Sequence, residues 1–304
     1  MKKIFYTILA IVLFNSCIEE YEVFYPYKNT TISYLKQLQN EGEKAVIAKN
    51  KSFKQVFEKG LIVELAENSF ADSYDTINFS LKQVNTIGKL IANRISMEDV
   101  NKNLINNTNI IEFSFSDING NHISLKTGNF IKFKIPYNNL KVPNIFRLTS
   151  KGWIISTYEN DKLIKSTWEV TGSEDPIIQK GYILSTDKQG IFCIGQTISE
   201  NLIIDRIRIS LPDGFNVDNS IVQMSLPELN TNVELYWDGE SKTFELPHKL
   251  QVPETEVNMT VISENSNMQA FFGMKYATLK NGDLIEVDVS KKRIEEIKSI
   301  LDNL

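Results

Sequence analysis

The sequence predicts a mainly β protein with two antiparallel β-sandwich modules and a short amphipathic helix at its C-terminus. Three observations carry this prediction. Apolar and polar residues alternate with period two over many short segments, Asn-Gly and Asp-Gly pairs stand between such segments, and the last residues have apolar positions at helical spacing. A hydrophobic content of 42% is sufficient for packed cores, which excludes a globally disordered chain.

The first seventeen residues have the layout of a bacterial secretory signal. Two lysines precede an apolar run over residues 4–14, and Ser16 stands directly before Cys17. A helix that spans a bilayer needs about 20 apolar residues, so this run is too short to be a membrane span. The sequence therefore predicts that residues 1–16 are a signal peptide, which is removed on export.

Residues 13–17 resemble the lipobox of bacterial lipoproteins, in which the cysteine becomes the lipidated first residue of the mature chain. The resemblance implies that Cys17 carries the lipid, although Phe14 stands where leucine is usual. One acyl chain binds a membrane only marginally, whereas the several chains of a lipoprotein cysteine give stable attachment. The alternative is an ordinary cleaved signal in which Cys17 is incidental.

The residues that follow Cys17 predict the membrane, and the face of that membrane, on which the anchored protein is located. Position 18 is isoleucine rather than aspartate, so the usual cue for retention at the inner membrane is absent. The acidic cluster over residues 19–22 resembles the signal that sends lipoproteins of the Bacteroidota to the outer face of the outer membrane. We therefore expect a lipid anchor in the outer membrane and a protein facing the cell exterior, with the periplasmic face as the alternative.

Residues 17–52 are expected to be a lipidated N-terminus and tether that lifts the modules off the membrane. The segment is polar in composition and contains a lysine-rich stretch near its end. Within it, the spacing of Ile32, Leu35 and Leu38 is typical of a short helix.

Charge and cysteine content exclude some classes of function. The formal net charge of −5 becomes −7 when residues 1–16, which contain two lysines and no acidic residue, are removed. A mildly acidic chain without a block of Lys or Arg lacks the electrostatic footprint of a nucleic-acid-binding protein. With Cys17 lipidated, Cys193 has no disulfide partner in the chain. Its apolar neighbours predict a buried side chain rather than a thiol nucleophile.

Residues 53–180 are predicted to form the first β-sandwich module. Its expected strands cover residues 111–116, 122–126, 130–135, 152–158 and 163–170. Asn119-Gly120 favours a type I′ hairpin turn between the first two of these strands. The polar residues 159–162 indicate a second hairpin between the last two, and Pro136 ends the strand before it because proline cannot donate to a sheet.

Residues 181–290 are predicted to form the second module, an immunoglobulin-like or transthyretin-like sandwich. Turn residues at Pro212-Asp213-Gly214, Asp238-Gly239 and Asn281-Gly282 punctuate a series of short strands, which is typical of such sandwiches. The expected strands cover residues 182–185, 191–194, 203–211, 221–226, 233–237, 243–246, 257–262, 268–279 and 284–289.

Residues 291–304 are predicted to form the C-terminal helix. Ser290 is the expected N-cap, and the apolar positions at helical spacing are Ile294, Ile297, Leu301 and Leu304. A helix of this length is marginal in isolation, so its apolar face must pack on something. We expect that it packs on the second sandwich.

The sequence gives little support for a catalytic, metal or cofactor site. No H-E-x-x-H, G-x-S-x-G, G-x-G-x-x-G or P-loop pattern occurs. The two histidines, His122 and His248, fall in different predicted modules and are interpreted as ordinary structural or surface residues. No catalytic residue, metal ligand or cofactor is therefore predicted.

Two groups of oxygen-bearing side chains offer alternative readings as a calcium site or a catalytic site. Asp117-x-Asn119-x-Asn121 has a spacing similar to a calcium loop, but its glycine precedes the third ligand and the closing glutamate is missing, so a hairpin is favoured. Paired carboxylates of a glycosidase are the other alternative. The candidate pairs are Glu174 with Asp175 and Asp72 with Asp75, which are more simply solvated loop residues.

Aromatic residues are the better functional candidates. The predicted platform for a sugar ligand, or groove for a partner, comprises Trp153, Tyr158, Trp168, Tyr236 and Trp237. Tryptophans in sandwiches usually belong to the core, so packing is the alternative, and exposure decides between the two.

The mature chain also resembles a largely uncharacterised group of Bacteroidota surface lipoproteins built from tandem β-sandwich modules. The matching elements are a Gly-Leu-Ile-Val-Glu-Leu-Ala-Glu strand at residues 60–67, a Lys-Phe-Lys-Ile-Pro strand at 132–136, a "G-W" strand at 152–153, a "T-x-x-x-G-x-F" element at 186–192 and a strand with a helix at 284–304. The last module resembles fimbrillin-like or transthyretin-like sandwiches. The resemblance implies fold and location and carries no catalytic residues.

These observations predict a non-enzymatic surface lipoprotein that acts as a binding or accessory module for a protein or glycan partner. Sandwiches suit this role because rigid strands hold variable loops. The alternative is a structural or adhesive subunit, which adds a strand to the open sheet edge of a neighbour. An unrecognised hydrolase is a third alternative.

Overall fold

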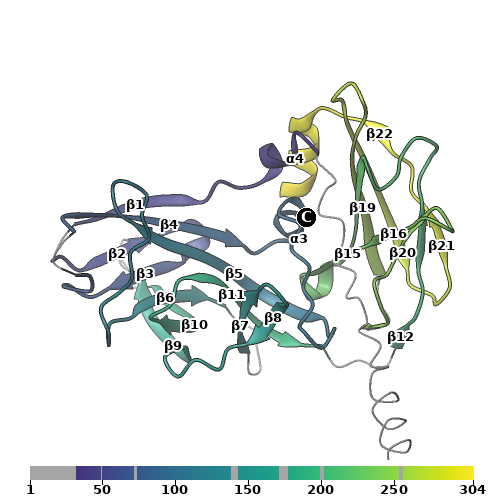
Figure 1. Ribbon diagram of the computed structural model, residues 1–304. Helices are drawn as coiled ribbons and strands as arrows, with labels where there is room; N and C mark the ends of the chain where they lie inside the picture. The colour runs from purple at the N-terminus through teal and green to yellow at the C-terminus, as the bar shows by residue number, and fades with distance from the viewer. Residues whose placement is uncertain are drawn as a thin grey trace, which may run out of the picture.

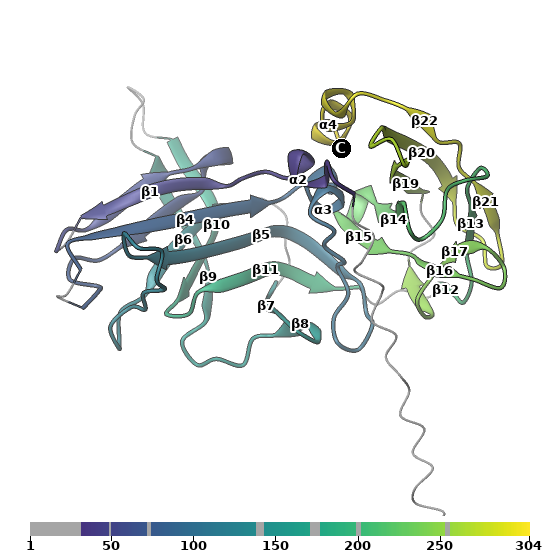
Figure 2. The same cartoon turned by 45° about the horizontal axis from the view of Figure 1, so that its top comes forward.

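The computed structural model describes residues 32–48, 50–71, 74–137, 143–170, 177–198, 202–252 and 256–304. They form two β-sandwich modules side by side, the first coloured purple to teal and the second green to yellow in Figure 1. Short helices lie between the two modules, as Figure 2 shows from above. The predicted class, mainly β with two sandwiches and a C-terminal helix, is confirmed.

The first sandwich consists of a six-stranded and a five-stranded antiparallel sheet. The larger sheet has the order β1 (Glu43–Ala48), β4 (Thr76–Val84), β5 (Ile105–Ser116), β11 (Gly190–Thr197), β7 (Asn144–Thr149) and β8 (Gly152–Ile155). The smaller has the order β2 (Phe53–Val56), β3 (Ile62–Leu65), β6 (Ile131–Pro136), β10 (Ile177–Thr186) and β9 (Lys162–Val170). The core between the sheets combines aliphatic side chains with a group of phenylalanines, which make edge-to-face, tilted and stacked contacts around Phe79 and Phe113.

The second sandwich has a mainly aliphatic core, and most of its strands are shorter than those of the first. A five-stranded sheet has the order β15 (Thr231–Glu234), β14 (Ser220–Leu226), β19 (Glu256–Glu264), β20 (Ala270–Thr278) and β22 (Ser290–Lys291). A four-stranded sheet has the order β16 (Tyr236–Asp238), β17 (Thr243–Glu245), β13 (Arg208–Ser210) and β21 (Leu284–Glu286), and β12 (Leu202–Ile204) pairs with β18 (Leu250–Val252). Strands β13 and β21 are parallel.

The predicted boundary between the modules at residue 180 is wrong. Strand β10 pairs with β6 and β9 in the smaller sheet of the first sandwich, and β11 pairs with β5 and β7 in its larger sheet. The first sandwich therefore extends to Thr197. Alternation shows that a segment is a strand with one buried face, but it does not show which strand becomes its neighbour.

Both predicted hairpins of the first module are also corrected. Strand β8 pairs with β7, and β9 pairs with β10, so residues 156–161 cross from one sheet to the other. Residues 122–126 form a loop with one isolated bridge between Ser116 and His122. In the Asn119-Gly120 pair only Gly120 has a positive φ, of 83°, so the turn is not type I′.

The two sandwiches meet at a seam, defined here as the hydrophobic cluster that contains residues of both modules and three helices. The helices are α2 (Leu35–Leu38), α3 (Ile87–Ala92) and α4 (Ile294–Asp302). Ile110 and Trp153 of the first sandwich share this cluster with Ile262 and Phe272 of the second. The seam therefore joins the modules through a continuous apolar core.

The C-terminal helix is confirmed, but two details of its prediction are wrong. Its N-cap is Arg293 rather than Ser290, and the Glu296 carboxylate accepts a hydrogen bond of 3.0 Å from the Arg293 backbone N–H. The helix packs in the seam, against α2 and α3, and not on the second sandwich alone. A Cβ at Gly88 of α3 would lie 1.7 Å from the Leu301 carbonyl oxygen, so only glycine permits this close crossing.

The predicted tether is wrong for residues 32–52. The expected helix around Ile32, Leu35 and Leu38 is confirmed as α2, but Ile32 and Leu38 are buried in the seam. The chain then continues into β1, which pairs along its whole length with β4. Ala45 and Ile47 give this strand an apolar face toward the first core, which explains why a polar segment joins the fold. Residues 17–31, including Cys17, lie outside the described residues.

Candidate functional site

Trp153 and Trp168, two members of the predicted aromatic platform, are buried. The Trp153 side chain is 0% exposed in the seam, where its Nε1–H donates a hydrogen bond of 2.9 Å to the Ser96 carbonyl. Trp168 is 7% exposed and lies over Gly181, where a Cβ would approach its ring to 2.7 Å. Neither ring is available to stack on a sugar.

Tyr236 and Trp237, the next two members of the platform, are half-buried neighbours on β16. Successive side chains of a strand point to opposite faces, so the two rings are not coplanar partners. Trp237 packs edge-to-face on Phe244, with ring centroids 5.1 Å apart. Burial, together with the charges of Glu98 and Glu234, raises the pKa of Tyr236 above its ordinary value.

Tyr158, the last member of the platform, is 52% exposed at the corner of the first sandwich. Its ring lies 4.6 Å from the Arg147 guanidinium, and the Phe192 ring lies 4.2 Å from the same cation. The five aromatic side chains therefore do not lie together on one face of the molecule. The prediction of a flat platform is wrong because core packing and separate sheets take most of its members.

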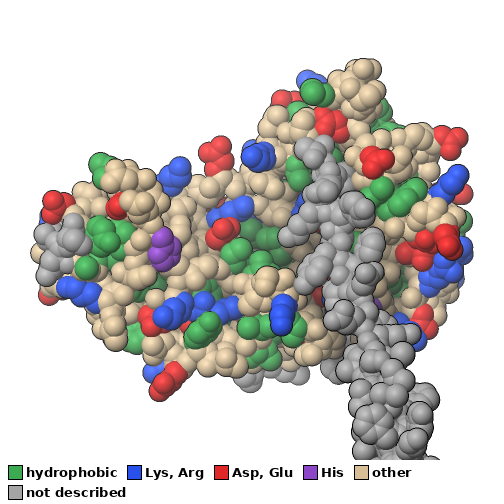
Figure 3. Space-filling model, in the orientation of Figure 1, with side chains coloured by type: hydrophobic (Ala, Val, Ile, Leu, Met, Phe, Trp, Pro, Cys, Tyr) green, Lys and Arg blue, Asp and Glu red, His purple; other side chains and the backbone are tan. Residues whose placement is uncertain are grey.

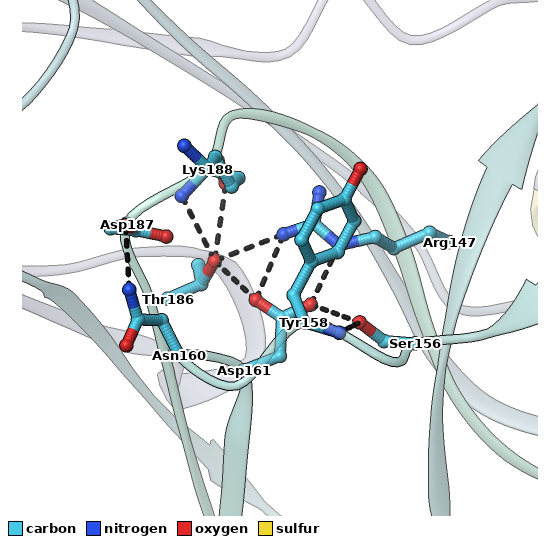
Figure 4. A network of polar contacts seen from close by, with 8 residues as sticks. All are labelled: Arg147, Ser156, Tyr158, Asn160, Asp161, Thr186, Asp187 and Lys188. Carbon is cyan, nitrogen blue, oxygen red and sulfur yellow. Dashed lines mark hydrogen bonds and ion pairs between the residues drawn. The ribbon is translucent and has the colours of Figure 1, made fainter.

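The corner around Arg147 contains a buried polar network that sequence reasoning did not find, here called the corner cluster (Figure 4). Arg147 of β7 donates two hydrogen bonds to Asp161, of 2.6 and 2.8 Å, and one of 3.1 Å to the Thr186 hydroxyl. Thr186 and Ser156 also donate to Asp161. The cluster therefore joins the crossover between β8 and β9 to the end of β10.

The ionisation of Asp161 follows from these contacts. Burial raises the pKa of its carboxyl group, but the hydrogen bonds from Arg147, Ser156 and Thr186 and the Arg147 charge outweigh burial. The pKa of Asp161 is therefore below its ordinary value. A bidentate, ionised pair of this kind fixes the geometry of two loops. The Arg147 guanidinium of this pair also contacts the exposed Tyr158 ring, so the pair has a structural role at this corner.

The polar side of the seam carries a second group of charged residues, here called the seam cluster. Arg94 is paired with Glu234 across the two modules. Glu98 of the first module contacts His248 Nε2 of the second at 2.6 Å, and its other oxygen accepts a hydrogen bond of 2.7 Å from the Ser96 hydroxyl. His248, interpreted from the sequence as an ordinary loop residue, is therefore part of the contact between the modules.

The remaining candidate residues do not assemble into a reactive site. His122 is exposed in its loop, and burial raises the pKa of the Cys193 thiol, which is 0% exposed, as expected for a small core residue. In the 117–121 loop, Asp117 accepts hydrogen bonds from the backbone N–H groups of Asn119 and Asn121. These bonds close the turn and occupy the carboxylate.

The described ranges contain neither a cluster of metal ligands nor a membrane-spanning helix. Within them, no three or more His, Cys, Asp or Glu side chains lie together in a way that could hold a metal ion. None of the helices found there combines the length and the apolar character that a membrane span requires. Asp72, Glu174 and Asp175, the candidate carboxylates, lie outside those ranges, whereas Asp75 lies in a described loop.

Comparison with known proteins gave no match. No protein-family model, no curated protein and no solved structure is similar to this chain at a significant level. The function must therefore be argued from the residues and their geometry.

Proposed function

We propose that this chain is an outer-membrane lipoprotein, anchored through Cys17 and facing the cell exterior, that acts as a non-catalytic binding or accessory module. The observation that supports the proposal is the way in which the N-terminal segment enters the fold. Ile32, Tyr34 and Leu38 are all buried in the seam, where the two sandwiches meet. An anchor upstream of Ile32 would therefore hold both modules as one unit.

Hydrogen bonds reinforce this entry point. The Ser33 backbone N–H donates a bond of 2.6 Å to Glu264 of β19, and its hydroxyl donates to the same carboxylate. The Tyr34 hydroxyl donates to the Ser263 carbonyl at 2.9 Å. A few residues later the chain is part of the first sandwich as β1. An entry point that is packed and hydrogen-bonded to both sandwiches suits a protein whose two modules are held together on one anchor.

A protein partner has more support than a glycan partner. Trp153 and Trp168 are buried, so a row of exposed tryptophans that stacks on sugars is not available. Leu148 and Ile155 are exposed on the outer face of the six-stranded sheet, and Ile191 is half-buried on the same face. Figure 3 shows hydrophobic side chains gathered in patches on the visible face of the first module. Contiguous apolar surface of this kind is typical of protein interaction sites.

The alternative function, a fibre subunit that adds strands, needs an open sheet edge. Strand β9 is the last strand of its sheet and exposes Ile164. However, Lys165 lies on the same face as Leu163, which packs against the core. An inward-pointing charge on an edge strand opposes pairing with another strand. We therefore propose the binding module and not the fibre subunit.

The anchor is tested with fatty-acid labelling of cells that express Cys17→Ser. We expect loss of the label and release of the protein from the outer membrane. Cys193→Ser is the matched control, because that thiol is buried in the first sandwich and should not affect labelling. Undiminished labelling of Cys17→Ser would contradict the proposal.

The partner surface is tested by pull-down of the intact lipoprotein from detergent-solubilised outer membranes. We expect specific proteins in the eluate of the wild-type chain and at least tenfold less of them with the double variant Leu148→Asp and Ile155→Asp. Val46→Asp is the control, because Val46 is exposed at the far edge of the same sheet. An eluate that is identical for all three chains would count against this surface.

A further inference from the structure

The outer face of the five-stranded sheet in the first sandwich carries a row of lysines. Cross-strand pairing aligns one residue from each strand, in the order Lys54, Glu64, Lys132, Ser185 and Lys162. The strand neighbours Phe133, Leu163 and Leu184 belong to the core of the first sandwich, so this row faces outward. The three lysines, here called the basic row, are exposed.

The basic row is produced by the fold and extends across the whole sheet. Neighbouring strands lie about 4.8 Å apart, so the lysines on every second strand follow one another at intervals of about 10 Å. They are far apart in the sequence, which is why no block of basic residues is visible there.

Protection of the sheet edges does not account for all of these cations. Lysines on edge strands oppose pairing with another chain, and this explains Lys54 on β2 and Lys162 on β9. Lys132 and Lys134, however, lie on β6, which is the central strand of the sheet. Their positions call for a different explanation.

The single acidic residue of the row does not cancel its charge. The Glu64 carboxylate lies 2.7 Å from Lys134 Nζ and 3.6 Å from Lys54 Nζ. No acidic side chain among the described residues pairs with Lys132 or Lys162. Together with Lys134, the face carries four lysines against one glutamate, a formal charge of +3 in a chain whose net charge is −5.

The next row on the same face is apolar apart from Lys134. It contains Val56, Ile62, Lys134, Ile183 and Ile164. Val56 is 56% and Ile164 58% exposed, at the two edges of the sheet. An anionic membrane attracts such a surface in two ways, because its headgroups pair with lysines and its interface takes up apolar side chains.

The type of cation favours a membrane over an acidic protein segment. All four cations of the face are lysines, which are flexible point charges, whereas arginine binds a carboxylate bidentately in a fixed geometry. Point charges at intervals of about 10 Å suit an array of headgroups, which supplies an anion wherever a lysine reaches. One acidic segment would have to cross all five strands to contact the whole basic row.

We propose that the outer face of the five-stranded sheet rests on the anionic headgroups of the membrane that holds the lipid anchor. The inference rests on the proposed anchor, which keeps this face close to the bilayer. The outer faces of the two sheets in a sandwich point in opposite directions. Contact through the basic row therefore leaves the surface around Leu148 and Ile155 turned away from the membrane and accessible to a protein partner.

Vesicle binding by the chain without its lipid tests the inference. The mature chain with Cys17→Ser is mixed with phosphatidylcholine vesicles that contain about 30% phosphatidylglycerol, or with phosphatidylcholine alone. We expect binding to the anionic vesicles only. The affinity should fall at least tenfold between about 0.1 M and about 1 M salt, because the Debye length shortens from about 10 Å to about 3 Å.

Neutralisation of the basic row should remove most of this binding. The triple variant Lys54→Gln, Lys132→Gln and Lys162→Gln is expected to bind about 100-fold more weakly, since each lysine near an anionic surface contributes about fivefold. Equal binding by this variant and the parent chain would overturn the inference. So would a parent chain that binds polyglutamate but not the vesicles, a result that favours an acidic protein partner.

A second triple variant is the matched control for net charge. Lys242→Gln, Lys280→Gln and Lys291→Gln remove the same charge from exposed positions of the second sandwich. We expect these changes to leave vesicle binding nearly unaltered. Equal weakening by both triple variants would show that net charge alone governs binding and would also overturn the inference.

A fluorescent label reports which face touches the membrane. Ile164→Cys and Ile155→Cys, made separately, place an exposed thiol on opposite outer faces of the first sandwich, and the native Cys193 is fully buried. An environment-sensitive dye at residue 164 should shift its emission to the blue on anionic vesicles. No shift at residue 164, or a shift at residue 155, contradicts the proposed orientation. Because both readouts omit the lipid, their failure is distinct from a failure of lipidation at Cys17.

Discussion

The corner cluster and the seam both join elements distant in the sequence, but they differ in how completely their polar groups are paired. At the corner, Arg147, Asp161 and Thr186 satisfy one another within a single module. On β19, which reaches the seam at Ile262, Asn258 and Thr260 keep buried polar atoms that no described residue pairs. The corner therefore gains stability from paired polar groups, whereas the unpaired groups on β19 each cost about 1–3 kcal/mol and the seam depends on apolar packing.

Removal of the charge of Asp161 tests the corner with the largest expected effect. Asp161→Asn leaves the buried Arg147 guanidinium without its counter-ion, which should lower the free energy of unfolding by about 3–5 kcal/mol. Asp205→Asn is the matched control, because Asp205 pairs with Lys249 in an exposed ion pair worth about 0–1 kcal/mol. Urea unfolding of each variant measures the change in its free energy of unfolding. Equal effects of the two changes would show that the corner is not a buried joint.

The same residue predicts how stability depends on pH. Because the folded-state pKa of Asp161 is lowered, its contribution is fully present above the unfolded-state pKa of about 3.9 and is lost as the pH falls through the folded-state pKa. The unfolding free energy of the wild-type protein should therefore fall more steeply below about pH 4 than that of Asp161→Asn. If the unfolding free energies of the two proteins fall equally steeply below about pH 4, this interpretation is contradicted.

The crossing of α3 and α4 tests the seam. A methyl group at Gly88 would overlap the Leu301 carbonyl, so Gly88→Ala should lower the free energy of unfolding by about 2–3 kcal/mol as α4 is displaced. Gly239→Ala is the control, because the nearest atom to its added Cβ is 4.0 Å away. Denaturant unfolding and protease sensitivity of the C-terminus report the result. An undisturbed C-terminal helix in Gly88→Ala would exclude the close crossing.

Trp153 tests whether the hydrogen bond to Ser96 holds the first module to the seam. Trp153→Phe removes the indole N–H and leaves the Ser96 carbonyl without this donor, at an expected cost of about 1–2 kcal/mol. Trp237→Phe should cost less, since Trp237 is only half-buried. The midpoint temperatures of thermal unfolding of the two variants, each relative to the wild-type protein, measure the two losses of stability. A larger loss with Trp237→Phe would reverse the ranking.

The smallest expected effect concerns Tyr158 at the rim of the corner cluster. Tyr158→Ala uncovers one face of the Arg147 guanidinium and should cost about 0.5–1 kcal/mol through loss of the cation–π contact. Tyr158→Phe keeps the ring and should leave stability unchanged. If Tyr158→Ala also leaves the free energy of unfolding unchanged, the exposed ring does not stabilise the corner cluster.

Local features of the sequence determined many of the strands and two of the helices of this protein. Alternation predicted the strand that became β6 and its end at Pro136, and helical spacing predicted both α2 and α4. The apolar neighbours of Cys193 predicted its burial. These features follow from residue types within a few positions of one another, because period and turn chemistry are local properties.

Only the tertiary structure decided which of these elements are neighbours. It assigned β10 and β11 to the first sandwich, separated β8 from β9, and brought the segment around Ile32 into the seam. It also buried Trp153 and Trp168 and paired Arg147 with Asp161. The physical reason is that each strand buries one face and offers hydrogen bonds on two edges, and many neighbours satisfy both requirements equally well. The choice among them depends on the packing of the whole chain, which no short stretch of sequence records.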